Sequence, residues 1–512
     1  MHTEKLSEPH VPYFQPQRLS PPKTALLPNL VKARWAKKRC LCVVSSAMIG
    51  RMRVAICYPP IPSPKGVPLL SQNRQFQWFS HPSVIYPVVP ASAATLLKAH
   101  GHEVLWLDGI ARGMTPETYW AALEDWRPEA VFLETKTPVV QFHWGWIAEL
   151  KRRMPGCRVV IGGDHVTALP EETQKAAPID YVIHGGDYDF ALLSWVEGRS
   201  VPVDLAALPP IDRTLTRWRD YAFRNGNFLR TPGAYMMAGR DCWHGKCTFC
   251  AWTTLYPRFR VRPVEAVLDE VGALIALGVR EIMDDTGTFP VGDWLRRFCE
   301  GMVARGYHRR VRLNCNMRFG VLAAEDFRRM RQAGFRMLLF GVESANQATL
   351  DRLCKGIRVE AIEAGVRAAA EAGLQPHLTL MVGYPWEGLA EAQATVALGR
   401  RLLRQGFAAS LQATWIVPYP GTPLFREVEA AGELLTHDWA AFDMRRPVMR
   451  SPLSSEEIQA LVAAAYRGFL QPRVLLRLGV RALLHPRYLL KGIGALLGHL
   501  RDFRWKAKAP TP

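Results

Sequence analysis

Long hydrophobic runs are missing from the sequence. No apolar stretch reaches the roughly 20 residues that a helix needs to cross a bilayer, and the mean hydropathy is near zero. We also expect no secretory leader, because the acidic residues Glu4 and Glu8 stand where the positively charged and then apolar part of a leader would lie. These absences argue against membrane-embedded and secreted classes, so we expect a cytoplasmic protein.

Cysteines and acidic residues are scarce. Ten cysteines occur in 512 residues and are scattered apart from one tight group, which argues against a disulfide framework. Lysine and arginine outnumber the acids 65 to 46, and this excess suits nucleic acid, an anionic membrane or phosphate-bearing cofactors alike. The length predicts two or three domains, and 48% hydrophobic with 22% charged residues is a globular composition.

The first 51 residues differ from the rest of the chain. Residues 12–28 are rich in proline, and Lys37, Lys38 and Arg39 precede only a short apolar stretch. We predict a disordered extension over residues 1–51, with Met48 or Met52 as an alternative start.

Residues 52–200 alternate between strand and helix patterns. The expected strands are 54–58, 104–107, 130–133, 158–161 and 181–183. This alternation predicts a Rossmann-like α/β domain with a parallel sheet and helices on both faces. Two strands end at the glycine pairs Gly162-Gly163 and Gly185-Gly186, where ligands of such sheets bind, although tight turns would explain the glycines equally well.

A second alternating region follows a proline-containing linker at residues 201–231. Its expected strands are 234–237, 281–283, 311–314, 337–340, 378–382 and 413–417, with helices between them. Six β/α units over residues 232–430 predict a partial (β/α)6 barrel, whose chemistry would lie at the carboxyl ends of its strands. Residues 431–512 are predicted to form a helical, basic C-terminal region.

The strongest chemical signal is a group of three cysteines, Cys242, Cys247 and Cys250, directly after the first barrel strand. Three thiolates on one loop suit a soft metal or an iron–sulfur cluster. Structural zinc is the alternative; it normally takes four ligands, and His244 is the candidate for the fourth. Three ligands alone would leave one iron open, which is a catalytic arrangement.

Polar segments follow the later barrel strands in order. They are Asp284-Asp285-Thr286, Asn316-Met317-Arg318, Gly341-Val342-Glu343-Ser344 and Gly383-Tyr384-Pro385. Together with the cysteine loop, they resemble the cobalamin-binding radical S-adenosylmethionine (SAM) enzymes, from about Arg53 to the C-terminus. The common cysteine spacing in that family is C-x3-C-x2-C, whereas this chain has C-x4-C-x2-C with the family's aromatic residue at Phe249.

The resemblance implies how SAM is held. It implies a [4Fe–4S] cluster on the three cysteines and contacts of Asp284, Asp285 and Thr286 with the methionine part of SAM. It also implies contacts of Arg318, Glu343 and Ser344 with the carboxylate and ribose, and of Gly383 with the adenine.

The resemblance also implies a cobalamin site in residues 52–200. Gly162, Gly163, Gly185 and Gly186 match its glycine-rich turns, and Thr135 and Thr137 are expected to meet the nucleotide tail. The family members that ligate cobalt from below carry Asp-x-His-x-x-Gly, whereas here His165 follows Asp164 directly. We therefore expect cobalt to have no lower histidine; the alternative is a Rossmann-like domain that has lost its ligand.

The implied function is reductive cleavage of SAM to a 5′-deoxyadenosyl radical, followed by methylation of an unactivated carbon in a small molecule. Cyclisation or rearrangement within the same family is the first alternative, and a zinc-stabilised, basic nucleic-acid-binding protein is the second. A one-electron donor such as flavodoxin or ferredoxin is expected as a partner, and nucleic acid is not. The basic, leucine-rich residues 472–508 suit either a solvated helical face or peripheral membrane contact.

Overall fold

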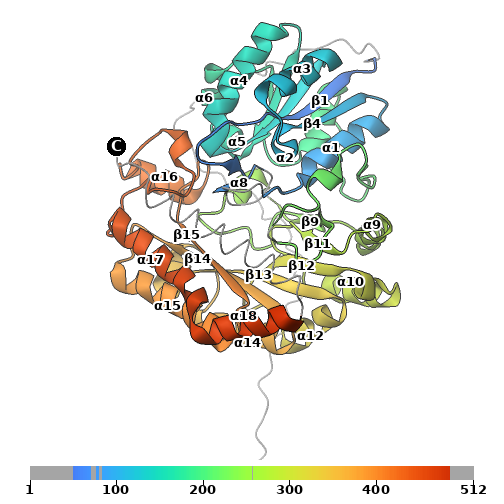
Figure 1. The fold of residues 1–512 in the computed structure, drawn as a ribbon. Helices are drawn as coiled ribbons and strands as arrows, with labels where there is room; N and C mark the ends of the chain where they lie inside the picture. Colours follow the sequence, from blue (N-terminus) through green and yellow to red (C-terminus); the bar gives the residue numbers. More distant parts are fainter. Residues whose placement is uncertain (1–49, 71–75, 80–82, 226, 257, 485–512) are drawn as a thin grey trace, which may run out of the picture. The chain divides into compact units, whose positions relative to one another are not determined.

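A computed structural model describes residues 50–70, 76–79, 83–225, 227–256 and 258–484 (Figure 1). The predicted extension, apart from residues 50 and 51, and the end of the predicted basic region lie outside these residues. Within them, no helix is long and apolar enough to cross a membrane.

The N-terminal domain contains a five-stranded parallel sheet in the order β4-β1-β5-β6-β7. The strands are β1 (Arg53–Tyr58), β4 (Glu103–Asp108), β5 (Ala130–Thr135), β6 (Arg158–Gly163) and β7 (Tyr181–Val182). Its longest helices are α1 (Val88–Ala99), α3 (Pro116–Trp126), α4 (Val140–Arg153) and α7 (Tyr188–Val196), and the shorter ones are α2 (Gly109–Arg112), α5 (Asp164–Ala168) and α6 (Pro170–Ala176).

Side chains that alternate between the two faces of this sheet build two cores. Val54 and Ile56 belong to the core that contains α1 and α7, whereas Ala55 and Cys57 belong to the core with α3 and α4. A strand buried on both faces reads as a continuous apolar run, which is why the sequence predicted it well. The expected Rossmann-like arrangement is confirmed.

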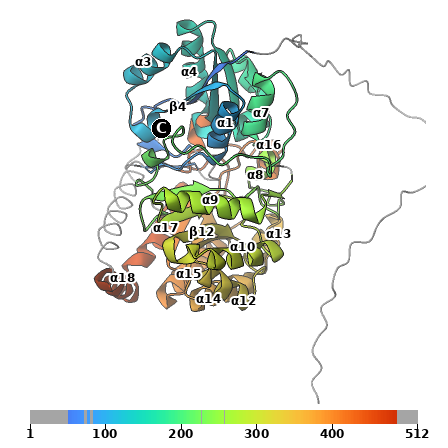
Figure 2. The ribbon, with the colours of Figure 1, turned by 90° about the vertical axis from the view of Figure 1, so that its right-hand side faces the viewer.

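The second domain contains a six-stranded parallel sheet in the order β15-β14-β13-β12-β11-β8. Its strands are β8 (Gly233–Met236), β11 (Glu281–Asp284), β12 (Arg312–Met317), β13 (Phe335–Glu343), β14 (Gln375–Val382) and β15 (Ser410–Trp415). The helices between them are α9 (Val264–Ala276), α10 (Asp293–Ala304), α12 (Ala324–Gln332), α14 (Val359–Glu371) and α15 (Leu389–Gln405). Helices α9, α10 and α12 lie side by side (Figure 2), and the expected partial barrel is confirmed.

Two features differ from the expectations. A two-stranded antiparallel ribbon, β9 (Gly239–Arg240) with β10 (Arg260–Val261), separates β8 from the cysteine loop and closes the loop at its base. Residues 436–453 are not helical apart from one short turn, Trp439–Ala441, because Pro447 and Pro452 interrupt any helix there. Helices α17 (Ser455–Arg467) and α18 (Pro472–Leu484) then follow.

Candidate functional site

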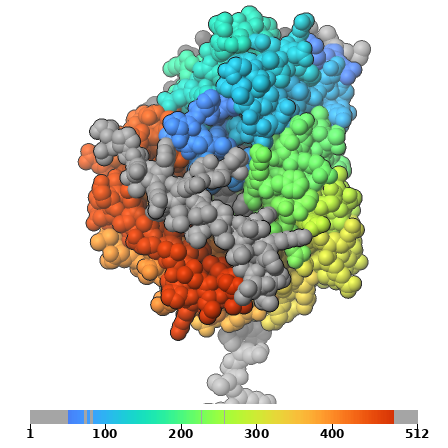
Figure 3. Space-filling view, in the orientation of Figure 1, coloured from blue at the N-terminus to red at the C-terminus, as the bar shows by residue number. Residues whose placement is uncertain are grey.

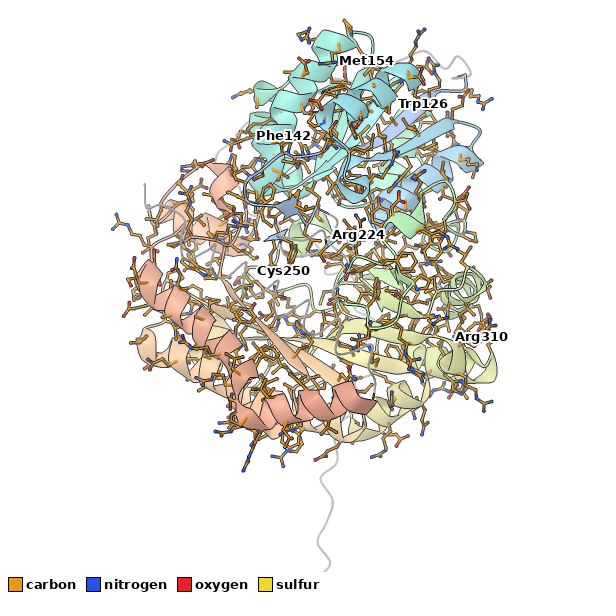
Figure 4. The ribbon with its side chains drawn as sticks, in the orientation of Figure 1. Trp126, Phe142, Met154, Arg224, Cys250 and Arg310 are labelled. Atoms are coloured by element: carbon orange, nitrogen blue, oxygen red, sulfur yellow. The ribbon has the colours of Figure 1, made fainter. Side chains whose placement is uncertain are left out.

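The cysteine loop lies between β9 and the short helix α8 (Trp252–Leu255), where Figure 4 labels Cys250. Cys242, Cys247 and Cys250 are all half-buried, and none of them forms a disulfide. The Sγ of Cys242 lies 2.9 Å from the Oγ1 of Thr288, in the loop after β11.

Three hydrogen bonds hold the backbone of the loop against the barrel. The Trp243 indole N–H donates to the carbonyl of Phe289 at 3.3 Å, and the Thr248 backbone N–H donates to the carbonyl of Leu353 at 3.1 Å. The Nε2 of His244 lies 2.7 Å from the Cys354 carbonyl and must donate to it, since a carbonyl only accepts. The Nε2 of His244 is therefore occupied by a hydrogen bond to the backbone.

The donor set fits an iron–sulfur cluster. Burial raises the pKa of the Cys247 thiol, while the charges of Lys355 and Arg318 act to lower it and would favour a thiolate. Among the described residues, no three His, Cys, Asp or Glu side chains are grouped to hold a single metal ion. In a [4Fe–4S] cluster each thiolate binds a different iron, so its three sulfurs need not converge on one point.

Asp284 and Thr286 form hydrogen bonds with residues 238 and 239, which lead into the cysteine loop. The two carboxylate oxygens of Asp284 accept the backbone N–H groups of Ala238, at 2.7 Å, and of Thr286, at 3.0 Å. The Gly239 N–H donates to the Thr286 hydroxyl at 3.0 Å. Burial raises the pKa of Asp284 to about 6, although these hydrogen bonds act to lower that pKa. Asp285, also buried, is the next residue at this strand end.

Arg318 follows β12, Glu343 is the last residue of β13 and Ser344 follows it, and all three are buried. The Arg318 guanidinium lies 5.5 Å from the ring centroid of Trp243, which places it beside the cysteine loop. Glu343 has a φ of 65°, unusual for a side-chain-bearing residue, and accepts a hydrogen bond from Lys355 Nζ at 2.8 Å. The Ser344 hydroxyl donates to Glu387 at 2.6 Å.

The last predicted SAM contact, Gly383, has a φ of 89° and lies at the end of β14. A Cβ at this position would come within 3.0 Å of Ile458 in α17. The predicted SAM contacts thus lie at the ends of four neighbouring strands, although several of their polar atoms are already bonded within the chain.

The predicted cobalamin contacts of the first domain lie at the ends of β5 and β6. Gly163 has a φ of 143°, and a Cβ there would lie 2.0 Å from the carbonyl oxygen of Thr135, so only glycine fits. Thr135 Oγ1 lies 2.7 Å from His143 Nδ1, and Thr137 Oγ1 lies 3.3 Å from His165 Nδ1.

The Nε2 atoms of His143 and His165 are buried without a hydrogen-bonding partner in the described part of the chain. Burial lowers the pKa of both imidazoles to about 3, which keeps them neutral. The Nε2 of His165 lies 3.7 Å from Glu172 Oε2, so the Nε2 of His143, whose other ring nitrogen contacts Thr135 at the end of β5, is the buried polar atom that fits a polar ligand such as the nucleotide tail of cobalamin.

The second glycine pair, Gly185-Gly186, lies at a contact between the two domains. A Cβ at Gly186 would lie 2.3 Å from the ring of Tyr256, directly after α8. The Gly186 N–H donates to the Leu255 carbonyl at 3.0 Å, and the Tyr256 hydroxyl donates to the Gly186 carbonyl at 3.0 Å. Gly185, with a φ of 86°, precedes this contact.

Sequence reasoning missed several site residues. They are Lys355 beside Glu343, Thr288 beside Cys242, and Glu134, which accepts a 2.6 Å hydrogen bond from the Tyr58 hydroxyl. Burial raises the pKa of Glu134 to about 7. An acid inside the apolar run 130–135 was the one signal in the sequence, since a charge in a fully buried strand calls for a partner.

Comparisons with known proteins agree with this arrangement. The B12 binding domain profile matches residues 82–193, and the Radical SAM superfamily profile matches residues 236–398. An uncharacterized methyltransferase, PH0819 of Pyrococcus horikoshii, is 28% identical over 415 residues, covering 73% of this chain and 86% of the relative. The anaerobic magnesium-protoporphyrin IX monomethyl ester cyclase of Cereibacter sphaeroides is 23% identical, covering 78% of this chain and 70% of the cyclase.

Solved structures share the fold. The radical SAM methyltransferase TsrM from Kitasatospora setae, with tryptophan and a SAM analogue bound, has a TM-score of 0.60 at 18% identity, covering 82% of this chain and 89% of TsrM. The cobalamin-dependent SAM radical enzyme OxsB has a TM-score of 0.62 at 14% identity, covering 81% of this chain and 66% of OxsB.

The two sheets and the cysteine loop define a radical SAM enzyme with an N-terminal B12-binding domain. The chain carries a B12 binding domain followed by a radical SAM domain, and its cofactors are a [4Fe–4S] cluster, SAM and cobalamin. The alternative of a zinc-stabilised nucleic-acid-binding protein is not favoured.

Proposed function

We propose that this chain methylates an unactivated carbon of a small-molecule substrate. The observation that carries the proposal is the bonding of Leu255 and Tyr256, close after Cys250, to Gly186 in the turn after β7. The segment with the three cysteines is thereby joined to a predicted cobalamin-binding turn. A radical formed in one domain and a methyl group held in the other can then serve the same substrate.

The residues of the chain would bind and orient these groups. When bound, the cluster and SAM supply a 5′-deoxyadenosyl radical, and cobalamin supplies a methyl group. Cys242, Cys247 and Cys250 would hold the cluster, with the positive charges of Arg318 and Lys355 beside it. Asp285, Thr286, Glu343 and Ser344 would border the SAM site, and Thr135 and Thr137 the cobalamin site.

The runner-up is cyclisation or rearrangement without methyl transfer. Its support is the resemblance to the anaerobic cyclase, which spans 438 residues, whereas the relative named a methyltransferase is the more similar of the two at 28% identity.

One experiment separates the two reactions even while the substrate is unidentified. The reconstituted enzyme is incubated with a small-molecule extract, a reductant and SAM deuterated in its methyl group. Methyl transfer through cobalamin yields both S-adenosylhomocysteine and 5′-deoxyadenosine, and the deuterium enters an extract molecule. Formation of 5′-deoxyadenosine alone, with no deuterium in any extract molecule, would overturn the proposal in favour of the cyclase type.

We also propose the setting in which the enzyme works. A one-electron donor such as flavodoxin or ferredoxin would reduce the cluster in the cytoplasm, and nucleic acid is not a substrate. The absence of any acidic residue between Glu457 and Asp502 supports contact of the C-terminal region with an anionic membrane. The exposed leucines of α18, Leu475, Leu476 and Leu478, support the same contact.

A further inference from the structure

The cysteine loop is attached to the first domain at both of its ends. At its beginning, Arg240 is the last residue of β9 and stands two positions before Cys242. At its end, Leu255 and Tyr256 bond to Gly186. We propose that Arg240 is a positioning residue that, with Asp187 and Asp189, fixes the cluster-bearing loop against the cobalamin-binding domain.

Arg240 makes a forked contact with two aspartates. Its Nη2 lies 2.6 Å from Asp189 Oδ2, and its Nη1 lies 2.9 Å from Asp187 Oδ1. The Arg240 side chain is 5% exposed and the Asp189 side chain 0%, so both charges are removed from water. The fork of a guanidinium fixes direction as well as distance, which a lysine ammonium does not.

A second arginine doubles the attachment. Arg260 lies opposite Arg240 in the β9–β10 ribbon, and its guanidinium contacts Asp187 at 2.8 and 3.0 Å. Asp187 therefore accepts from both strands at the base of the loop. Residues 186–189, directly after the predicted cobalamin contact Gly185, hold the beginning and the end of the loop together.

A contribution to folding stability does not by itself explain a buried ion-pair network of this kind. Two charges lose their hydration on burial, and replacing a buried ion pair with apolar residues of similar volume is often neutral or stabilising. A network of this kind does select one geometry over its alternatives. Here the geometry is the placement of the cluster relative to cobalamin, so the inference rests on the proposed function.

The test compares Arg240→Lys and Arg240→Met with wild type in two measurements. In the cofactor-free protein, hydrogen exchange reports the backbone of residues 241–256. In the holoenzyme with a reduced cluster and cob(II)alamin, pulsed electron paramagnetic resonance reports the distance distribution between the two paramagnetic centres. Arg336→Lys and Arg336→Met are the matched controls, because Arg336 forms a similarly buried pair with Glu281 at 2.6 Å, at the opposite end of the barrel strands.

Both Arg240 variants are expected to exchange faster over residues 241–256 and to lose the narrow distance distribution of wild type. Both controls are expected to keep wild-type behaviour in the two measurements. If Arg240→Met does not fold, Arg240→Lys decides, since it keeps the charge and loses only the fork. Unchanged exchange and an unchanged distribution in the folded variants would overturn the inference. A wild-type protein that binds no cluster or no cobalamin would instead contradict the proposed function, and the exchange measurement would still test the attachment.

Discussion

Single residues around the cysteine loop fall into two groups. Trp243, His244 and Thr248 fix the backbone of the loop to neighbouring carbonyls, as Asp284 fixes the segment before it. The thiols of Cys242, Cys247 and Cys250 are the proposed ligands of the cluster, and the cations Arg318 and Lys355 lie beside them. Replacing a residue of the first group should therefore change the order of the loop before it changes the ligands.

His244 provides the first prediction. His244→Ala should retain the iron and sulfide of the wild-type cluster, because the Nε2 of His244 already donates to the Cys354 carbonyl and three thiolates suffice. Iron and acid-labile sulfide are measured after anaerobic reconstitution, with Cys247→Ala as the positive control for loss. A stoichiometric loss of iron in His244→Ala would make the histidine a ligand and the site a closed one.

His165 provides the second prediction. Because His165 directly follows Asp164, rather than standing in Asp-x-His-x-x-Gly, the cobalt of bound cob(II)alamin should have no protein nitrogen beneath it. Electron paramagnetic resonance reads this directly, since an axial nitrogen adds superhyperfine splitting. Nitrogen splitting that disappears in His165→Ala would show that this buried imidazole ligates cobalt after all.

His143 provides a pH prediction for the cofactor-free protein. Its pKa is lowered by burial from 6.5 to about 3, so the unfolded state takes up a proton below pH 6.5 while the native state does not. The stability contributed by the neutral imidazole is present above pH 6.5 and is lost as pH falls toward 3. Between pH 7 and 5, wild type should lose about 2 kcal/mol more than His143→Gln in urea unfolding.

The comparison with the variant is needed because the pKa shifts of other groups change the folding stability with pH in the opposite direction. Burial raises the pKa of Glu134 to about 7, so the cost of its ionisation appears as pH rises. Equal pH dependence of wild type and His143→Gln would show that His143 is protonated in the native state.

The site residues that the sequence predicted belong to recognisable segments of the chain, whereas those that it did not predict are defined by a partner elsewhere in the sequence. The cysteines and strand-end segments were predictable because their spacing along the chain carries the signal. Arg240 and Lys355 were not, since an arginine or lysine in a basic chain gives no signal until its partner is known. Asp189 lies 51 positions from Arg240 in the sequence.

Among the elements, the buried parallel strands were the most predictable and the ribbon the least. Strands such as β5 and β6 contain apolar runs whose ends are marked by polar or glycine residues. The two-residue strands β9 and β10 are too short to show any period, and an arginine from each contacts Asp187, which is distant in the sequence. The expectation that residues 436–453 are helical was wrong, and Pro447 and Pro452 are the residues in this stretch that oppose a helix.

Helix α18 leads to an element-scale prediction. Leu475, Leu476, Leu478 and Val480 are 46%, 69%, 43% and 47% exposed, and Figure 3 shows this helix at the surface. Exposed leucines beside basic residues, in a stretch of sequence without an acid from residue 458 to residue 501, are typical of a helix that binds an anionic membrane. The full chain should therefore bind phosphatidylglycerol vesicles, and Leu476→Glu with Leu478→Glu should weaken binding by about tenfold or more.

Vesicle sedimentation measures this binding, and Leu435→Glu is the control because Leu435 is 52% exposed and lies outside α18. Binding that is equally strong for neutral vesicles, or that the α18 variant retains in full, would contradict membrane contact and favour the solvated helical face.

At the scale of the whole molecule, order along the chain made the architecture predictable. Each barrel strand pairs with its neighbour in sequence, so the sheet order follows directly from counting β/α units. In the first domain the strand order is β4-β1-β5-β6-β7, with β1 between β4 and β5. The hydrophobic pattern of the sequence does not predict this position of β1. The contacts between the domains were likewise beyond sequence reasoning, because residues 186–189 meet residues 240–260 only in the folded chain.

The central claim is that the three cysteines hold a cluster that cleaves SAM. Its most direct test is the formation of 5′-deoxyadenosine from SAM under reducing, anaerobic conditions, compared between wild type and a variant with Cys242, Cys247 and Cys250 all replaced by Ala. Cys157→Ala is the control, because Cys157 is a buried thiol between α4 and β6 of the first domain and does not belong to the cysteine loop. We predict that wild type and the control form 5′-deoxyadenosine and that the triple variant forms none and holds no iron. Formation of 5′-deoxyadenosine with retained iron in the triple variant would contradict the claim.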